Sequence, residues 1–196
     1  YTAHKMFINK NKYYIYIESL RSINIDLIKT KSKFNLIYRN NLKKENTNKI
    51  IKFIKLCKKK YIKFFVLNDL SLALKIGADG VYLPSYNKAL LKKKELVGKK
   101  IEVIGSAHNF KEINIKKKQG CKEVVLSRLF ETDYKDKKSF FGITRFNLLT
   151  KNYKNDFIAL GGIRSNNLMK IKMLNCEGIA LLSEAKKKPA IIRRLL

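Results

Sequence analysis

The sequence predicts an α/β fold in which a single domain, residues 1–196, forms a (β/α)8 barrel. Strand-like and helix-like segments alternate along the whole chain, and eight such pairs can be counted. Several strand segments, among them KFFVL at 63–67 and FIAL at 157–160, are continuous apolar runs. Such runs are typical of parallel strands that are buried on both faces. Eight pairs favour a closed barrel over an open doubly wound sheet.

The strands are predicted where β-branched, aromatic and apolar residues cluster, as in YYIYI and FNLIY near the start of the chain. Their expected ranges are 13–17, 34–38, 63–67, 80–83, 101–105, 123–129, 157–160 and 179–182. Pro84 ends the fourth of them, because proline cannot donate to a strand ladder.

The helices are predicted from apolar residues at helical spacing, most clearly in the second helix, which has Ile50, Phe53, Ile54 and Cys57 on one face. Gly77 and Gly120 stop two of the helices as C-cap glycines. The expected ranges are 22–31, 45–59, 70–76, 87–97, 110–119, 142–151, 166–174 and 184–195. A polar loop is expected between the sixth strand and its helix, over residues 130–139.

The net charge of +29 is the strongest compositional signal, and it can indicate a nucleic-acid or membrane surface. However, lysine, isoleucine and asparagine are all abundant, as an AT-rich genome produces, and the lysines are spread over the chain. The densest lysine runs lie in or at the ends of expected helices, where we expect solvated faces. These runs are 58–60, 92–94, 116–118 and 186–188. We therefore expect no specific nucleic-acid partner, although such a field should draw anionic ligands inward.

The remaining composition indicates a reduced, cytoplasmic protein. Cys57, Cys121 and Cys176 are far apart, odd in number and without metal-site spacing, so we expect reduced core thiols. No stretch approaches the roughly 20 apolar residues that span a bilayer, and residues 1–16 lack the apolar segment of a signal peptide. We expect no membrane partner, and the sequence leaves a homo-oligomer as an open alternative to a monomer.

Active sites of (β/α)8 barrels lie on the loops that follow the strands, so polar residues at the strand ends are the candidates. After the seventh strand, Gly161 and Gly162 allow a phosphate to approach the backbone at a helix N-terminus. Leu182 and Ser183 occupy the matching place after the eighth strand, and these two loops are the usual phosphate site of the fold. The alternative is a tight turn without a ligand.

Two other strand ends leave their interpretation open. Asp69, directly after Asn68, is a carboxylate that can hold Mg²⁺ for a diphosphate, or equally an N-cap for the helix that begins there. His108 precedes another helix, and capping or packing is the favoured role for it. The sequence has neither a GxxxxGK[ST] nor a GxGxxG motif, which argues against P-loop and dinucleotide-binding functions.

Several of these segments together resemble the thiamine-phosphate synthase/TenI family. They are YRNN, FFVLNDLSLALKIGADGVYLP, VIGSAHN, FETDYK, FIALGGI and EGIALLSEA, in this order. They cover nearly the whole chain, and the combination of ND, ADGV, S-x-H and GGI is specific. The resemblance implies a phosphate-binding TIM barrel of thiamine biosynthesis.

The resemblance to the synthase implies a condensation of hydroxymethylpyrimidine diphosphate with thiazole phosphate, with pyrophosphate released and Mg²⁺ as cofactor. Small phosphorylated pyrimidine and thiazole substrates are then the expected partners. The implied diphosphate and substrate contacts are Arg39, Asn68, Ser106, His108, Arg128, Thr132 and Lys135. Of these, Arg39, Ser106 and Lys135 are the expected catalytic residues. The implied metal ligands are Asp69 and Asn87, and the thiazole-phosphate site comprises Gly161, Gly162, Leu182 and Ser183.

The sequence departs from the synthase pattern at several of these places. The family's Q-x-R-x-K after strand two is reduced to Arg39, and the second metal carboxylate after strand four is replaced by Asn87. In the loop after strand six, Thr132 and Lys135 remain but a second threonine and a proline do not. Losing an anionic ligand and a cation should weaken metal and diphosphate binding.

Two alternatives follow from the same resemblance. LPS at 83–85 and FETD at 130–133 are more similar to TenI, a thiazole tautomerase. The histidine that shuttles protons in TenI corresponds to Arg128 here, and an arginine is a poor proton shuttle near neutral pH. The other alternative is a non-catalytic relative that binds a phosphorylated ligand.

Overall fold

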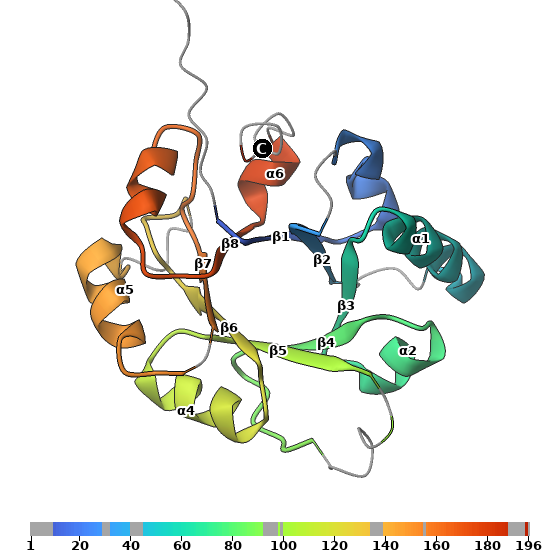
Figure 1. Cartoon of the computed structure of the whole chain (residues 1–196), viewed down its shortest axis with the longest axis horizontal. Coiled ribbons are helices and arrows are strands. Elements are labelled where there is room, and N and C mark those ends of the chain that lie inside the picture. Colours follow the sequence, from blue (N-terminus) through green and yellow to red (C-terminus); the bar gives the residue numbers. More distant parts are fainter. Residues whose placement is uncertain are drawn as a thin grey trace, which may run out of the picture.

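The computed structural model describes residues 10–28, 32–39, 45–91, 98, 100–133, 139–154, 156–187 and 195. Eight parallel strands form a closed barrel in which each strand pairs with its sequence neighbours and β8 returns to β1 (Figure 1). The strands are β1 (Lys12–Ile17), β2 (Phe34–Tyr38), β3 (Lys63–Leu67), β4 (Gly80–Leu83), β5 (Glu102–Ala107), β6 (Glu123–Ser127), β7 (Asp156–Leu160) and β8 (Gly178–Leu181). The predicted (β/α)8 barrel is therefore confirmed.

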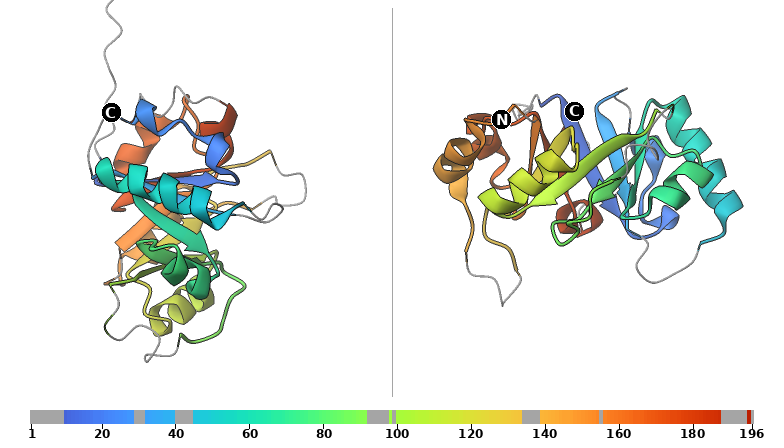
Figure 2. Two further views of the ribbon diagram at one scale, coloured as in Figure 1. Left: turned by 90° about the vertical axis from the view of Figure 1, so that its right-hand side faces the viewer. Right: turned by 90° about the horizontal axis from the view of Figure 1, so that it is seen from below.

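Helices lie outside the ring of strands, as the two side views in Figure 2 also show. They are α1 (Thr47–Lys59), α2 (Leu70–Lys75), α4 (Phe110–Lys118), α5 (Gly142–Thr150) and α6 (Ser183–Lys187). Asn46, Asp69 and Asn109 begin α1, α2 and α4 by accepting backbone N–H groups with their side chains. The positions of these three capping residues in the sequence therefore determine where the helices begin.

Three expected helices differ in the structure. Of the helix expected at 22–31, the described residues 22–28 form only the end of the 3₁₀ turn η1 (Leu20–Ser22) and the 3₁₀ turn η2 (Ile25–Leu27), because Ser19 and Asn24 each cap a turn locally. The helix expected at 166–174 is the 3₁₀ helix η3 (Leu168–Met173). Residues 87–91 of the helix expected at 87–97 are irregular, and the rest of it lies outside the described residues. The last helix begins at Ser183, and residues 188–194 also lie outside the description.

Two apolar clusters follow from the alternation of side chains along each strand. The interior cluster takes residues from all eight strands: Tyr14, Tyr16, Ile37, Phe65, Tyr82, Ile104, Val125, Ile158 and Ala180. The larger cluster joins the outer faces of the strands to the helices. Cys57 and Cys121 are buried in it, and burial raises the pKa of these thiols to about 12 and about 11, which makes them unreactive. Cys176 is half-buried, and none of the three cysteines is part of a disulfide.

The N-terminal mouth of the barrel is filled by charged side chains of both signs. Glu123 is buried and accepts hydrogen bonds from Lys12 Nζ at 2.7 Å and from the Tyr14 hydroxyl at 2.6 Å. Lys12 Nζ also lies 3.5 Å from Asp156, and Lys63 forms an ion pair with Glu102. Both lysines are therefore paired with carboxylates at this mouth.

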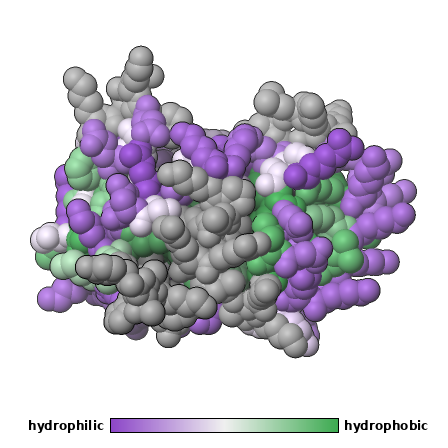
Figure 3. All heavy atoms as spheres, turned by 90° about the horizontal axis from the view of Figure 1, so that it is seen from above, coloured by the Kyte–Doolittle hydropathy of each residue, from purple (hydrophilic) through white to green (hydrophobic). Residues whose placement is uncertain are grey.

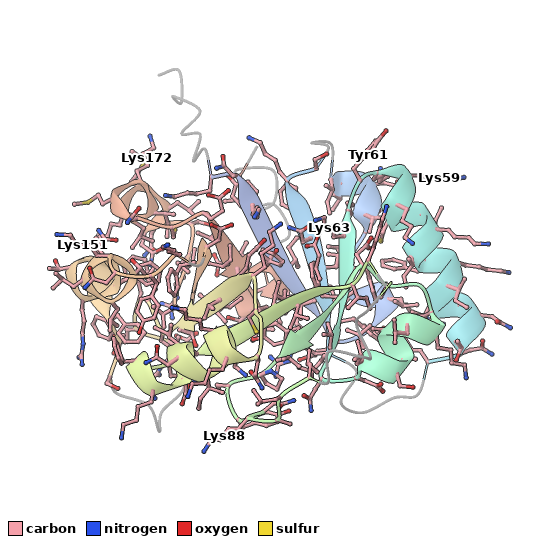
Figure 4. All side chains as sticks on the ribbon, turned by 60° about the horizontal axis from the view of Figure 1, so that its bottom comes forward. Lys59, Tyr61, Lys63, Lys88, Lys151 and Lys172 are labelled. Atoms are coloured by element: carbon pink, nitrogen blue, oxygen red, sulfur yellow. The ribbon has the colours of Figure 1, made fainter. Side chains whose placement is uncertain are left out.

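Most described lysines lie on the surface, as expected. The lysines labelled in the periphery of Figure 4, Lys59, Lys88, Lys151 and Lys172, point away from the ribbon. On the face in Figure 3, hydrophilic side chains spread across the whole width of the molecule and are not gathered in one patch. The expectation of a solvated face is wrong for Lys116, which has no exposed surface. Across the described ranges, no helix is both long and apolar enough to cross a membrane.

Candidate active site

The C-terminal mouth of the barrel holds a cavity of about 450 Å³. It is lined by Tyr16, Arg39, Leu67, Tyr82, Pro84, Ser85, Tyr86, Ser106, His108, Ser127, Arg128, Thr132, Leu160, Gly161, Gly162, Ile163, Ala180, Leu181, Leu182, Ser183 and Glu184. The volume suits a ligand of small-molecule size.

Most of the residues singled out from the sequence meet around this cavity. The lining includes Arg39, Ser106, His108, Arg128, Thr132, Gly161, Gly162, Leu182 and Ser183. Asn68, Asp69 and Asn87 are not in the lining, although Asn87 and Asn68 contact one another at the ends of β4 and β3. Lys135 lies outside the described residues.

Two tyrosines that sequence reasoning missed lie beside Ser106 in the cavity. The Tyr16 hydroxyl donates to the Tyr82 hydroxyl at 2.8 Å, and Ser106 forms a hydrogen bond with Tyr82. Burial raises the pKa of both phenols, and for Tyr16 the neighbouring Tyr82 adds to the shift, so both stay protonated at neutral pH. The missed signal was the alternation in YYIYI, which places Tyr14 and Tyr16 on one strand face. Only barrel closure turns that face inward.

Arg39 supplies a positive charge at one side of the cavity. Its backbone N–H donates to the Ile17 carbonyl, which continues the β1–β2 pairing by one residue. Its guanidinium carbon lies 5.6 Å from the centroid of the Tyr16 ring, within the range of a cation–π contact. The residue is half-buried, so its charge can act on an anion inside the cavity.

Gly161 and Gly162 form a turn that no other residue fits. Their φ angles are +104° and +66°, in the region that favours glycine. A Cβ on Gly162 would lie 2.3 Å from the carbonyl oxygen of Glu131, so the loop after β6 packs directly on this turn. Asn167 braces the turn by donating to the Gly162 carbonyl at 2.8 Å and accepting from the Arg164 N–H at 2.8 Å. The turn therefore joins two of the loops that surround the cavity.

A carboxylate that sequence reasoning also missed borders the loops that were predicted to bind phosphate. Glu184 follows Ser183 in the first turn of α6 and is buried. Its Oε1 accepts long hydrogen bonds from the Ser165 N–H at 3.4 Å and the Ser165 hydroxyl at 3.3 Å. It therefore ties α6 to the loop after β7.

The ends of β3 and β4 carry the residues that were considered for a metal. Asp69 is exposed; its Oδ1 accepts the Leu72 N–H at 2.8 Å, so it is the N-cap of α2. Its other carboxylate oxygen has no partner among the described residues. The Asn87 oxygen accepts the Ala89 N–H at 2.8 Å, and its amide nitrogen donates to Asn68. Asn68 has φ of +53°, a conformation that asparagine tolerates.

These donors do not form a preformed metal cage. Within the described ranges, no three His, Cys, Asp or Glu side chains gather closely enough to hold an ion. Mg²⁺ is commonly bound by one or two carboxylates together with phosphate oxygens of a substrate. One exposed carboxylate with a free oxygen fits an ion that arrives with a diphosphate.

Arg128 and His108 both have local partners. Arg128 donates to Thr132 Oγ1 at 3.1 Å and to the Ser139 carbonyl at 2.8 Å, at the two ends of the β6 loop. His108 Nδ1 lies 3.0 Å from Glu112, which also accepts the His108 N–H at 2.7 Å. The helix cap itself is Asn109, whose side chain accepts the Glu112 N–H at 3.0 Å. His108 therefore contacts the start of α4 and is also one of the residues that line the cavity.

A sequence model described as "Thiamine monophosphate synthase" (TMP-TENI) matches residues 9–185. The chain belongs to this family. It is 34% identical over 142 residues to a thiamine-phosphate synthase of Prochlorococcus marinus (strain AS9601), a match that covers 71% of this chain and 40% of that protein. A thiamine-phosphate synthase of Flavobacterium johnsoniae is 31% identical over 152 residues, with 72% of both chains covered.

This member of the thiamine monophosphate synthase family spans about two fifths of the Prochlorococcus relative. Among solved structures, thiamine phosphate pyrophosphorylase from Pyrococcus furiosus aligns with a TM-score of 0.70 at 19% identity, covering 95% of this chain and 96% of that one. N-(5'-phosphoribosyl)anthranilate isomerase from the same organism aligns with a TM-score of 0.63 at 17% identity, covering 94% and 96%. At these identities the alignments show the barrel fold alone.

Proposed function

We propose that this chain is a thiamine-phosphate synthase, which condenses hydroxymethylpyrimidine diphosphate with thiazole phosphate and releases pyrophosphate. The observation that carries the proposal is the meeting of Arg39, Ser106, the Gly161–Gly162 turn and Ser183 around one cavity, in a chain of this family. These groups come from the ends of four different strands, so one cavity offers a cation at one side and a phosphate cradle at another.

In the proposed reaction, the bond between the pyrimidine methylene carbon and the diphosphate oxygen breaks, and pyrophosphate leaves with the electron pair. The ring nitrogen of the thiazole then forms the new carbon–nitrogen bond with the methylene cation. Arg39 and Lys135 would meet the negative charge that develops on the leaving group, as preorganised electrostatic stabilisation requires. Ser106 and Asn68 would orient the pyrimidine end through hydrogen bonds.

The thiazole phosphate would lie against the Gly161–Gly162 turn and Ser183, where backbone N–H groups and the start of α6 favour an anion. Holding both substrates in one cavity turns a bimolecular reaction into an effectively unimolecular one. The protonated Tyr16 and Tyr82 hydroxyls would add neutral hydrogen-bonding groups in the same cavity.

Asp69 would hold Mg²⁺ through its free carboxylate oxygen, with the diphosphate supplying further ligands. The ion, when bound, would neutralise negative charge on the departing diphosphate. Asn87 would join it only if its amide turned over, which would break the contacts with Asn68 and Ala89.

The proposal is tested by supplying purified protein with both substrates and Mg²⁺ and measuring thiamine phosphate and pyrophosphate. The two products are expected in equal amounts, and neither is expected when one substrate is left out. Arg39→Met should lower turnover by about 10²-fold, the scale typical of losing one electrostatic group. Arg145→Met, which changes an exposed arginine of α5, is the matched control and should leave turnover unchanged.

Two other results would replace the proposal. Isomerisation of the thiazole carboxylate without thiamine phosphate, improved by Arg128→His, would identify a TenI-type tautomerase. Phosphate binding at Gly162 and Ser183 without either reaction would identify a non-catalytic relative.

A further inference from the structure

Lys116 is the one described lysine whose side chain has no exposed surface. It belongs to α4, and its Nζ reaches the loop that follows β4. There it donates to the Pro84 carbonyl at 2.7 Å, the Asn87 carbonyl at 2.8 Å and Gln119 Oε1 at 2.9 Å. Burial lowers the pKa of Lys116, but three oxygen acceptors match the three protons of an ammonium. The buried charge is thus fully hydrogen-bonded.

The barrel makes room for this side chain at Gly105 of β5. A Cβ at that position would lie 2.6 Å from Lys116 Cδ, so the lysine stem passes directly over the strand backbone. Gly105 has no positive φ that would require glycine. The close approach of Lys116 is therefore the physical reason for glycine here.

Gln119 holds the same loop from one turn further along the helix. Its Nε2 donates to the Ala89 carbonyl at 2.7 Å and to the Asn87 carbonyl at 3.1 Å, and it is also buried. Lys116 and Gln119 together bind three carbonyl groups of residues 84–89. The loop has one further backbone hydrogen bond of its own, from the Asn87 N–H to the Pro84 carbonyl at 3.0 Å, so the two side chains supply most of its support.

The held loop is the one that supports the proposed diphosphate end of the site. With its backbone fixed, Asn87 directs its amide nitrogen to Asn68, the residue before Asp69. The same loop carries Ser85 and Tyr86 into the cavity lining. A chain of contacts thus runs from the buried ammonium to the ends of β3 and β4.

We infer that Lys116 and Gln119 are positioning residues, which hold the loop after β4 so that Asn87 keeps Asn68 in place for the pyrimidine diphosphate. This inference rests on the proposed function, which it deepens by assigning the loop's geometry to a buried lysine. It also predicts a division within the site: the diphosphate end depends on Lys116, whereas the thiazole-phosphate end, on β7 and β8, does not.

The test compares Lys116→Met with Lys117→Met, which changes an exposed neighbour on the same helix by the same chemistry. Lys116→Met is expected to raise the KM for the pyrimidine diphosphate about tenfold and to leave the KM for thiazole phosphate within twofold. Lys117→Met is expected to change neither. Gln119→Met removes contacts to the same loop without removing a charge. It replaces Lys116→Met in the test if that variant does not fold.

Calorimetry with Mg²⁺ and inorganic pyrophosphate gives a readout that does not depend on turnover. Weaker pyrophosphate binding in Lys116→Met or Gln119→Met, but not in Lys117→Met, supports the inference even if the wild type makes no thiamine phosphate. In that case only the proposed function fails. Equal losses at both substrates, unchanged KM values, or a wild type that does not bind pyrophosphate would overturn the inference.

Discussion

The two mouths of the barrel are built from the same eight strands, but one is filled by paired side chains and the other contains a cavity. At the N-terminal mouth, Lys12, Glu123, Asp156, Lys63 and Glu102 pair with one another. At the C-terminal mouth, Arg39 and Arg128 border a cavity of about 450 Å³. The ion pairs fill one end, whereas the other end keeps space.

Left-handed backbone does not separate the two mouths. Asn68, Gly161 and Gly162 follow strands, whereas Ser32, Tyr61, Gly77 and Gly120 precede them. The two mouths differ in packing: the C-terminal mouth has the cavity, and Gly161 and Gly162 line it. We therefore expect one mouth to contribute stability and the other to contribute binding, which substitutions can separate.

The largest effect on stability is expected at the N-terminal mouth. Glu123→Ala should lower the free energy of unfolding by about 3 kcal/mol or more, because it leaves Lys12 and the Tyr14 hydroxyl without their buried partner. Urea unfolding measures it. Glu102→Ala, which removes a partly exposed ion pair with Lys63, should cost less than about 1 kcal/mol. If Glu123→Ala instead weakened pyrophosphate binding at full stability, the division between the mouths would be wrong.

A loss of turnover without a loss of stability is expected from Asp69→Asn. Asparagine caps a helix as well as aspartate does, so α2 should persist while the charge for Mg²⁺ is removed. Turnover should fall by about 10²-fold. Asn46→Ala, which removes the cap of α1, should cost about 1 kcal/mol of stability and leave turnover intact. Full activity of Asp69→Asn would remove Asp69 from the proposed metal site.

A smaller effect on binding is expected from Gly162→Ala, with Gly77→Ala as its control for backbone strain. Both glycines have nearly the same φ, +66° and +67°, so strain alone should cost each variant about 1 kcal/mol of stability. At Gly162 the new Cβ would also overlap the backbone of the loop after β6, which must shift, so this variant should lose more stability than Gly77→Ala, where nothing lies within 4 Å. Phosphate binding, followed by calorimetry, should weaken only in Gly162→Ala. Equal binding in both variants would argue against a phosphate at this turn.

The smallest effect concerns the dependence of stability on pH. It is absent at neutral pH and appears only in alkaline solution. Burial opposes the charge of Lys12, but the hydrogen bond and the charge of Glu123 outweigh it, so the pKa of Lys12 is raised. Burial, together with Glu123, raises the pKa of Tyr14. Groups whose folded pKa is raised stabilise the protein fully below their unfolded values, about 10 for both side chains, and this stability is lost as the pH rises further.

The free energy of unfolding should therefore be flat toward about pH 9.5 and fall above it. Urea titrations across this range, with tyrosinate absorbance, measure it. The slope should be shallower in Glu123→Gln, which removes the charge that raises both pKa values. If Glu123→Gln left the slope unchanged, the loss of stability in alkaline solution would come from other groups.

Local patterns in the sequence determined the order of strands and helices and several helix starts. Apolar runs and capping residues such as Asn46 and Asn109 act over a few residues, so they can be read without tertiary structure. The 3₁₀ turns at 20–27 could not be distinguished from a helix, because weak apolar periodicity competed with the side-chain caps of Ser19 and Asn24. The strand-end rule also named Arg39, Ser106, Gly162 and Ser183, which do line the cavity.

Only barrel closure decided which side chains the cavity and its supports would include. Tyr16 and Tyr82 lie 66 positions apart, and their hydroxyl contact depends on the register of four strands. Lys116, in a run of three lysines, is distinguished from Lys117 and Lys118 only by the face of α4 that packs over Gly105. Burial of a charge requires partners from elsewhere in the chain, here the carbonyls of Pro84 and Asn87, and a local pattern carries no information about them.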